Sequence, residues 1–471
     1  MNYTAVVRMI SVLGLIMAAA LVIGGGVALI YEEWPQLAAF SVAFFIVVVL
    51  STSVLLLTSK PTRKANPKDG LAVLILWWFL ASIIGAIPFM FDAPYGAVTA
   101  VLHESVSSLT TTGHVVIVPG TDEAPGWPIS LIVWRGILHV LGAMASLVAA
   151  ASIFAALNLG GPGIHRTVLF TIPEGSFFNA LPRVVVAAAL ALGLMTLAIF
   201  ALLMASGLPF GFALGDAVSV ATTGLVIPGR EAIGPAGWLH TAILSLGLIG
   251  STIGLAVALE VWAGRWRGGF RDPEVSALLL TLLVIGAAAM IAGHTAWQGF
   301  GLGLSYISTS GLPLYDPSLP LKTPVTLLII PAVIGGSALS TAGGFKLARL
   351  ALLLGRAGEE FARLGFRDSV VIMRYRGRIL PDAAIVGVWV YLVAYITALG
   401  GLMLMTGLCH LDFDASVKTS VGWLSNTGSL VDLTQVYRPR LADIVGIFAM
   451  LLGRLEVIAL IPAFSWGFWR A

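Results

Sequence analysis

Long apolar runs dominate this chain and are separated by short polar stretches. Runs of 18 or more mostly apolar residues are long enough to cross a bilayer as a helix, and ten of them recur along the 471 residues. Their approximate bounds are 6–30, 37–57, 71–91, 129–157, 181–205, 238–262, 275–292, 323–354, 383–408 and 441–469. The first run exceeds a signal-peptide core and no clear small-x-small cleavage site follows it. The pattern therefore predicts an all-α polytopic membrane protein with ten transmembrane segments.

Composition agrees with this pattern. Hydrophobic residues make up 58% of the chain and charged residues only 10%, whereas a soluble domain carries about 25% charged residues. Such a chain has too little polar surface for a water-facing globule and too much apolar content for a disordered segment. The single cysteine, Cys409, allows no intrachain disulfide.

The charged residues divide between two sets of loops, with basic residues concentrated in every second loop. Of 26 basic residues, 18 fall at the termini or in every second loop, mainly in 60–68, 166–183, 265–271 and 349–378. Because Lys and Arg in short loops stay on the cytoplasmic side, we expect both termini to be cytoplasmic. The basic pI then reflects topology and gives no argument for nucleic acid. The outer loops are acidic, which either concentrates cations at an entrance or reflects ordinary loop composition.

Four outer intervals are too apolar for loops and too short for two spans. Each contains a helical stretch, small hydroxyl or amide residues and then glycine, within segments 103–114, 216–225, 304–312 and 421–429. This order predicts four repeats of span, re-entrant pore loop and span, in a pseudo-fourfold arrangement after two extra N-terminal spans. The expected units are 1–69, 70–165, 166–270, 271–378 and 379–471.

The composition of these intervals suits a cation pathway. Non-helical backbone at membrane depth is tolerated only where it is buried in protein or lines a wet cavity. Glycine permits backbone angles that align successive carbonyls, and four such strands around one axis form an oxygen ring that replaces a cation's water shell. A divalent ion would favour carboxylates, so we expect a weakly hydrated monovalent ion. One Ser/Thr-Gly more often ends a helix or forms a turn, but four on the same side make coincidence a poor explanation.

These repeats, together with Trp134-Arg135, the run from Gly335 to Lys346, and Gly453-Arg454-Leu455-Glu456, resemble the Trk/Ktr/HKT superfamily of K⁺ transporters. The resemblance covers nearly the whole chain and is to the TrkH-type membrane subunit. It implies a single-chain pseudo-fourfold pore in the bacterial cytoplasmic (inner) membrane. It also implies a homodimer and a separately encoded, cytosolic nucleotide-binding regulatory subunit (TrkA-like).

The same resemblance implies which residues form the selectivity filter. They are Thr111, Thr112, Gly113, Thr222, Thr223, Gly224, Thr309, Ser310, Gly311, Asn426, Thr427 and Gly428. Glycine rather than serine at the first filter position implies preference for K⁺ over Na⁺. The chain departs from the family pattern at His114, Ser310 and Ser429, which bears on ion affinity and selectivity.

The eighth apolar segment is longer than one crossing requires. Residues 322–354 would form a helix of about 50 Å, whereas the hydrocarbon core is about 30 Å thick. We expect Gly335, Gly336, Gly343 and Gly344 to break it into a flexible constriction that gates the pore, with Lys346 beside them. The alternative is glycine at a tight helix crossing. The run lacks the Gly-Lys-Ser/Thr ending of a phosphate loop, so we expect no organic cofactor on this chain.

Three charged residues fall on the expected ion path. An arginine within an apolar span needs a partner or water, and the family resemblance implies that Arg454 hydrogen-bonds the gate loop and repels cations until the loop moves. A pair with Glu456 is disfavoured, because residues two apart face different sides of a helix. Glu104 and Asp216 either add negative potential or accept hydrogen bonds from nearby backbone. His114 makes uptake pH-sensitive or simply points away from the pore.

The leading hypothesis is therefore K⁺ uptake. A Na⁺-conducting member of the same superfamily is the first alternative, and a multispan membrane enzyme is the second, although the chain has no Gly-x-Ser-x-Gly and no obvious catalytic cluster. Ion-coupled transport and passive flux through a gated channel both fit the sequence. The basic segment 349–378 suits either docking of the regulatory subunit or contact with anionic membrane lipid.

Overall fold

The computed structural model describes residues 1–59, 67–91, 98–117, 120–121, 124–154, 177–254, 257, 264, 269, 272–315, 323–365, 374–375, 378–379, 382–433, 436, 439–460 and 465–469. Within them the fold is helical, apart from two minimal hairpins. Strand β1 (Gly120–Thr121) pairs with β2 (Ala124–Pro125), and β3 (Arg374–Tyr375) pairs with β4 (Arg378–Ile379). Most of the predicted basic loops lie outside the described residues.

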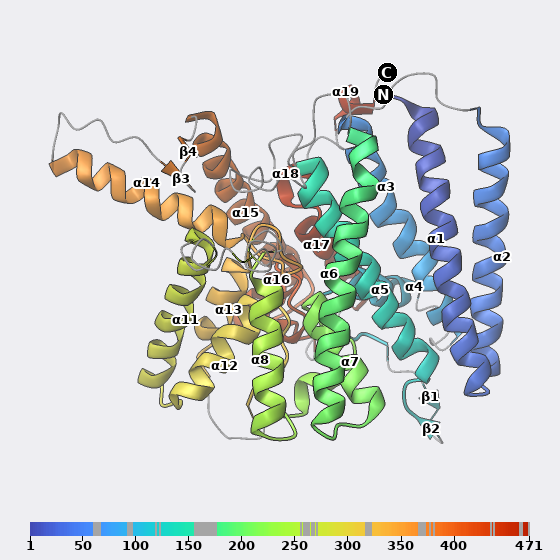
Figure 1. Ribbon diagram of the computed structural model, residues 1–471, viewed down its shortest axis with the longest axis horizontal. Coiled ribbons are helices and arrows are strands. Elements are labelled where there is room, and N and C mark those ends of the chain that lie inside the picture. Colours follow the sequence, from blue (N-terminus) through green and yellow to red (C-terminus); the bar gives the residue numbers. More distant parts are fainter. Residues whose placement is uncertain are drawn as a thin grey trace.

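Seven helices of the described chain are long and apolar enough to cross a membrane. They are α1 (Tyr3–Ile30), α2 (Trp34–Leu57), α3 (Pro67–Ala86) with η1 (Ile87–Phe91), α5 (Ile129–Val148) with η2 (Ala149–Phe154), α6 (Phe177–Ala205), α11 (Pro273–Ile291) and α15 (Asp382–Leu408). Figure 1 shows α1 and α2 side by side at one edge of the molecule. The prediction of an all-α, multi-pass membrane protein is confirmed.

Three predicted spans differ from single long helices. Helix α8 (Trp238–Thr252) has 15 residues, α13 (Val325–Ile334) has 10 and α17 (Pro439–Arg454) has 16. After α13 the backbone turns at Gly335, whose φ is 70°, and helix resumes as α14 (Leu347–Gly365). After α17 the chain turns at Glu456, with φ 56°, before the short helices α18 (Val457–Leu460) and α19 (Trp466–Trp469). The run 441–469 is therefore not one continuous helix.

Four short helices lie between longer ones. They are α4 (Val98–Leu109), α7 (Phe210–Thr222), α12 (Ala296–Ile307) and α16 (Phe413–Leu424). Each contacts both the helix before it and the helix after it, so that α4 packs on α3 and α5 and α16 packs on α15 and α17. The short helices therefore end inside the protein, where their last residues are buried.

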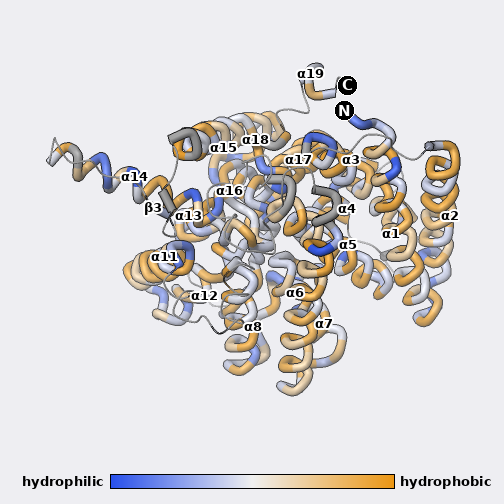
Figure 2. The backbone as a smooth tube through the Cα atoms, turned by 45° about the horizontal axis from the view of Figure 1, so that its top comes forward, coloured by the Kyte–Doolittle hydropathy of each residue, from blue (hydrophilic) through white to orange (hydrophobic). Residues whose placement is uncertain are grey.

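The distribution of polar residues is the reverse of that in a soluble protein. Large apolar side chains lie exposed on outer helices, with Leu57 87% and Ile291 90% accessible, and Figure 2 shows these helices as mostly hydrophobic. The interior instead holds many hydroxyl side chains, including Ser108, Ser305 and Ser420, which are at most 2% accessible. An apolar exterior, with many hydroxyl side chains among the apolar residues of the interior, suits a protein whose outer helices face lipid.

Both ends of the described chain lie together. The hydroxyl of Tyr3 at the start of α1 donates a hydrogen bond to the carbonyl of Trp469 in α19. Nearby, the backbone N–H of Asn2 donates to Asp69 at the start of α3, at 2.8 Å. The first and last helices and the beginning of α3 are thereby joined at one end of the molecule.

Candidate functional site

Within two residues of the end of each of the four short helices lies a residue other than glycine with left-handed backbone angles. Thr111, Thr223, Thr309 and Asn426 have φ values of 57°, 54°, 57° and 58°. A non-glycine residue with positive φ is uncommon, and threonine, which is β-branched, is strained there. The same unfavourable φ value at the ends of four buried helices indicates that the surrounding fold holds these turns in place.

Hydrogen bonds turn the backbone N–H groups of these segments back toward their own helices. The N–H of Gly113 donates to Ser107 O at 3.1 Å, that of Gly224 to Ser219 O at 3.0 Å, and that of Gly311 to Ser305 O at 3.2 Å. In the fourth segment the N–H of Thr427 donates to Gly422 O at 2.7 Å. Because these N–H groups are bonded toward their own helices, the polar backbone groups on the other side of each segment are carbonyl oxygens.

The fold brings the predicted filter segments together. A Cβ at Gly113 would meet the backbone of Leu225, and one at Gly224 would collide with Thr111 O. The N–H of Gly428 donates to Thr112 O at 2.9 Å. Gly311 lies against Ser429 of the fourth segment. These contacts connect all four segments and explain why glycine stands at each position.

The predicted filter residues are also fully enclosed. Thr112, Thr223, Ser310, Asn426 and Thr427 have no accessible surface, and Thr111, Thr222 and Thr309 are 1% accessible. Hydroxyl groups satisfy one another here, as in the contacts of 2.8 Å between Thr110 and Thr112 and of 3.0 Å between Ser425 and Thr427. The side-chain amide of Asn426 donates to Thr112 Oγ1 and to Met450 O, both at 3.1 Å.

Glu104 on α4 and Arg135 on α5 form an ion pair with no accessible surface. Arg135 Nη2 also donates to Gly113 O at 3.0 Å and to Leu225 O at 3.2 Å, and its Nε donates to Val226 O at 3.0 Å. One guanidinium thus fastens the first filter segment to the second. The planar donor fork of arginine here serves buried carbonyls.

Asp216 on α7 is neutralised in a similar way. Its carboxylate accepts from Arg230 Nε at 2.8 Å and Nη2 at 2.9 Å, and lies 3.0 Å from His240 Nε2. Arg230 is itself buried, at 2% accessible. Of the two roles left open for Glu104 and Asp216, the structure supports that of hydrogen-bond acceptor, since Glu104 also accepts from the N–H of Val116 at 2.9 Å. No spacing in the sequence pairs these acids with their bases.

The glycine-rich segment after α13 forms a closed loop. Its ends are joined by hydrogen bonds from the N–H groups of Phe345 to Val333 O and of Lys346 to Ile334 O, both 2.8 Å. Gly335 and Gly344 meet at the base, with φ values of 70° and 78°, and a Cβ on either would collide with the other strand of the loop. The loop therefore requires glycine at both positions.

This loop lies directly against the ends of three short helices. Thr341 Oγ1 donates to Ala221 O at 3.2 Å, and the N–H of Gly343 donates to Thr309 Oγ1 at 2.8 Å. Gly343 is also packed on Ser425 O. The loop thus contacts the second, third and fourth filter segments from one side.

Arg454 lies at the end of α17 beside the loop. Its Nη1 donates to Thr341 O at 2.8 Å, and its Nε and Nη2 have no hydrogen-bond partner among the described residues. Glu456 pairs with Arg349 on α14, and the ammonium group of Lys346 donates to Ala342 O. Arg454 is 7% accessible and holds an incompletely compensated positive charge next to the loop.

His114, which follows the first filter glycine, belongs to a second polar group. Its ring lies 5.6 Å from that of His103 on α4, and His103 Nδ1 is 3.6 Å from Asp443 on α17. Thr99 Oγ1 donates to the same carboxylate at 2.9 Å. Nothing in the sequence spacing connected these residues, which come from the first and last thirds of the chain.

The fold and this site define a multi-pass membrane protein with four buried, glycine-containing turns beneath which a glycine-rich loop lies. No family model matches the chain. It is 28% identical to the Trk system potassium uptake protein TrkH of Salmonella typhimurium, with 100% of both chains covered. It is 24% identical to the Trk system potassium uptake protein TrkG of Escherichia coli K12, covering 94% of each.

The structure of the potassium transporter TrkH from Vibrio parahaemolyticus has the same fold. It superposes with a TM-score of 0.84 over 100% of both chains, at 23% sequence identity. With the relatives above, this similarity confirms the predicted resemblance to a TrkH-type subunit. These relatives are named for potassium uptake.

The Arg135 contacts yield a test of how the filter segments are held. Arg135→Ala leaves Glu104 as a buried, unpaired charge, and breaking such a pair costs about 3–5 kcal/mol. We therefore expect a large fall in the thermal unfolding midpoint of the purified protein in detergent. Arg183→Ala, which removes an exposed arginine on α6, is the control and should leave the midpoint unchanged. Equal midpoints for the two variants would contradict the assigned role of Arg135.

Proposed function

We propose that this chain carries K⁺ into the cell across the bacterial cytoplasmic membrane, through a selectivity filter of four backbone strands. The observation that supports it most is the set of four matching left-handed turns, buried together at the ends of four short helices. The full-length similarity to proteins named for potassium uptake points the same way.

In this proposal the chain crosses the membrane ten times. The seven long helices provide seven crossings, and α8, α13 with α14, and α17 contribute the other three. Each short helix with its two neighbours then forms one of four repeats around a pseudo-fourfold axis, after two extra N-terminal spans. Both termini face the cytoplasm, in keeping with the basic loops and the contact between the two ends of the chain.

The charge state of the filter surroundings favours a monovalent ion. Glu104 on α4 and Asp216 on α7 are both paired with buried arginines. The filter residues themselves supply neutral carbonyl and hydroxyl oxygens. Divalent cations prefer carboxylate ligands, whereas a ring of neutral oxygens suits an ion that loses its water at low cost, such as K⁺.

The glycine-rich loop and Arg454 are proposed as the gate. The loop contacts three of the four filter segments, so a cation that leaves the filter meets it next. The guanidinium of Arg454 holds Thr341 O and adds positive charge in a region of low dielectric constant, where repulsion of a cation is strong. Movement of the loop would open the path and shift this charge.

The proposed assembly is a homodimer with a cytosolic, nucleotide-binding regulatory subunit. The relatives are named as parts of a Trk system, which favours a partner beyond this chain. Helix α14 extends away from the other helices (Figure 1), and Arg356 on it pairs with Glu359 and Glu360 of the same helix. This extension and the basic segment that contains it offer a docking surface on the cytoplasmic side.

Uptake in a K⁺-transport-deficient bacterium tests the proposal. Cells that produce the chain with its cognate regulatory subunit should take up ⁸⁶Rb⁺ and grow at low K⁺, and an excess of Na⁺ should not compete. Uptake abolished by Na⁺ would instead assign the chain to the Na⁺-conducting members of the superfamily. Absence of cation uptake despite normal membrane insertion would overturn the proposal.

Gly113→Ser tests the first filter position. Its φ of 76° and the Leu225 backbone beside it leave no room for a side chain without displacing the carbonyls. We expect the Na⁺ to K⁺ permeability ratio to rise by about tenfold, which corresponds to about 1.4 kcal/mol of lost discrimination. Gly250→Ser on α8, which has open space around it, is the matched control. The ratio is measured from competitive flux, and an unchanged ratio would argue against a filter at Gly113.

Arg454→Ala tests the gate. Removal of the positive charge and of the bond to Thr341 O should raise ion leak through the unstimulated protein by about tenfold, equivalent to about 1.4 kcal/mol less repulsion. The K⁺ to Na⁺ ratio should stay the same, because the filter is untouched. Arg440→Ala, an exposed arginine on the same helix, should change neither quantity. A leak that stays at the level of the unsubstituted protein would exclude this role for Arg454.

A further inference from the structure

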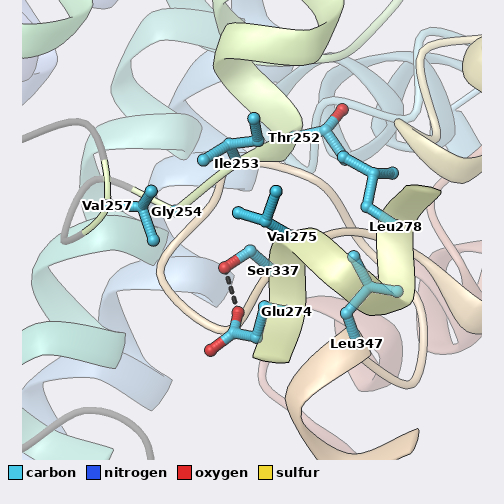
Figure 3. A pocket seen from close by; sticks show the side chains of 9 residues that line it. All are labelled: Thr252, Ile253, Gly254, Val257, Glu274, Val275, Leu278, Ser337 and Leu347. Carbon is cyan, nitrogen blue, oxygen red and sulfur yellow. Dashed lines mark hydrogen bonds between the residues drawn. The ribbon is translucent and has the colours of Figure 1, made fainter. Parts of the chain in front are cut away.

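Glu274 is a buried acid that the proposed pore and gate do not use. It is the second residue of α11 and is 2% accessible. Its Oε2 accepts hydrogen bonds from the hydroxyl of Ser337, as Figure 3 shows, and from the N–H of Ala338 at 2.9 Å. Both donors belong to the first half of the glycine-rich loop.

The second oxygen of the same carboxylate points to a different part of the chain. Glu274 Oε1 accepts a hydrogen bond from the hydroxyl of Tyr375 at 3.3 Å. Tyr375 belongs to strand β3 of the hairpin that follows α14, and its ring is 5% accessible. It packs with Leu352 of α14 and Val388 of α15. One carboxylate thus joins the glycine-rich loop to a hairpin anchored on two other helices.

The attachment of the loop at Glu274 is rigid. Asp272 caps α11 by accepting from the N–H of Glu274 at 3.0 Å, which fixes the start of the helix. The N–H of Ser337 donates to Thr252 O of α8 at 3.0 Å, and a Cβ on Gly254 would collide with the Ser337 side chain. Both residues line the pocket in Figure 3. The loop is therefore held at Ser337 from this side and at Thr341 by Arg454 from the other.

A favourable interaction with the helix N-terminus alone does not account for Glu274. An acid in the first turn of a helix is stabilised by the helix dipole even when it is exposed. Burial of a carboxylate costs free energy unless its oxygens are hydrogen-bonded, and here they are bonded by groups of two separate segments. The position of this acid thus serves the connection between those segments.

We propose that Glu274 is a positioning residue that couples the β3–β4 hairpin to the glycine-rich loop, so that displacement of the hairpin by a cytosolic partner loosens the first half of the loop. The coupling rests on the proposed gating function for its consequence in transport. The physical connection itself is independent of which ion crosses. Because the hairpin is also packed on α14, motion of that extended helix reaches the loop through the same carboxylate.

Thiol labelling of the loop tests this connection. The lone Cys409 has no accessible surface, so the unsubstituted chain provides the background rate. A thiol introduced by Ser340→Cys, a 6% accessible site on the loop, is then labelled with a charged methanethiosulfonate reagent in vesicles that contain the full chain. Glu274→Ala should raise the labelling rate by about tenfold, as expected for lost hydrogen bonds to a charged group.

Two further variants separate coupling from a merely structural effect. Glu274→Gln should restore most of the protection, because its amide oxygen can accept from the loop while its NH₂ donates to Tyr375. Tyr375→Phe leaves the loop contacts in place, yet should raise labelling by about threefold if the hairpin is coupled. Glu359→Gln, which removes an acid paired with Arg356 on α14, should leave the rate unchanged.

Two results would overturn the proposal. One is a labelling rate that stays constant on Glu274→Ala, and the other is a Tyr375→Phe variant that labels as slowly as the parent protein. If Glu274→Ala fails to fold, the Gln and Phe variants still decide the question by their labelling rates. Lack of Rb⁺ flux through the unsubstituted protein would contradict the proposed function but not the coupling, since the labelling assay does not depend on transport.

Discussion

Irregular backbone inside an apolar medium must find a hydrogen-bond partner for every buried N–H and C=O group. In this protein four helices stop within the interior, and their turns remain stable because of a few buried donors. Arg135 is the most important of them. A single guanidinium bonds Glu104 and three carbonyls from two filter segments. Without such a group, these carbonyls would lose their hydrogen-bond donor inside the protein, and in the proposed filter they would turn away from a passing ion.

The same constraint accounts for the glycine-rich loop. Its polar groups are buried in the protein, and it uses a hydroxyl group beside α12, the guanidinium of Arg454 and the carboxylate of Glu274 as partners. Of these contacts, the one in which Thr341 O accepts from Arg454 can be exchanged for water or for a passing cation, because a carbonyl oxygen binds either. A loop held by a few replaceable hydrogen bonds can move, whereas a packed helix at the same place could not.

The sequence predicted the parts that depend on local composition. Apolar runs located seven long helices, and the hydroxyl-glycine segments located the four buried turns. The excess length of the eighth apolar run predicted the break that the structure has at Gly335. In contrast, the pairing of Glu104 with Arg135 and of Asp216 with Arg230 links positions whose separation carries no periodic signal. Such pairs depend on how helices cross in three dimensions, which composition does not determine.

The central claim is that four buried turns form a pathway selective for K⁺, and flux against an imposed potential tests it most directly. The purified chain with its regulatory subunit is reconstituted in vesicles, and ⁸⁶Rb⁺ entry is followed as the membrane potential is set by an independent ionophore gradient. The account predicts entry that follows the potential and is blocked by K⁺ but not by an equal concentration of Na⁺. Entry that Na⁺ blocks as well as K⁺ does would contradict it.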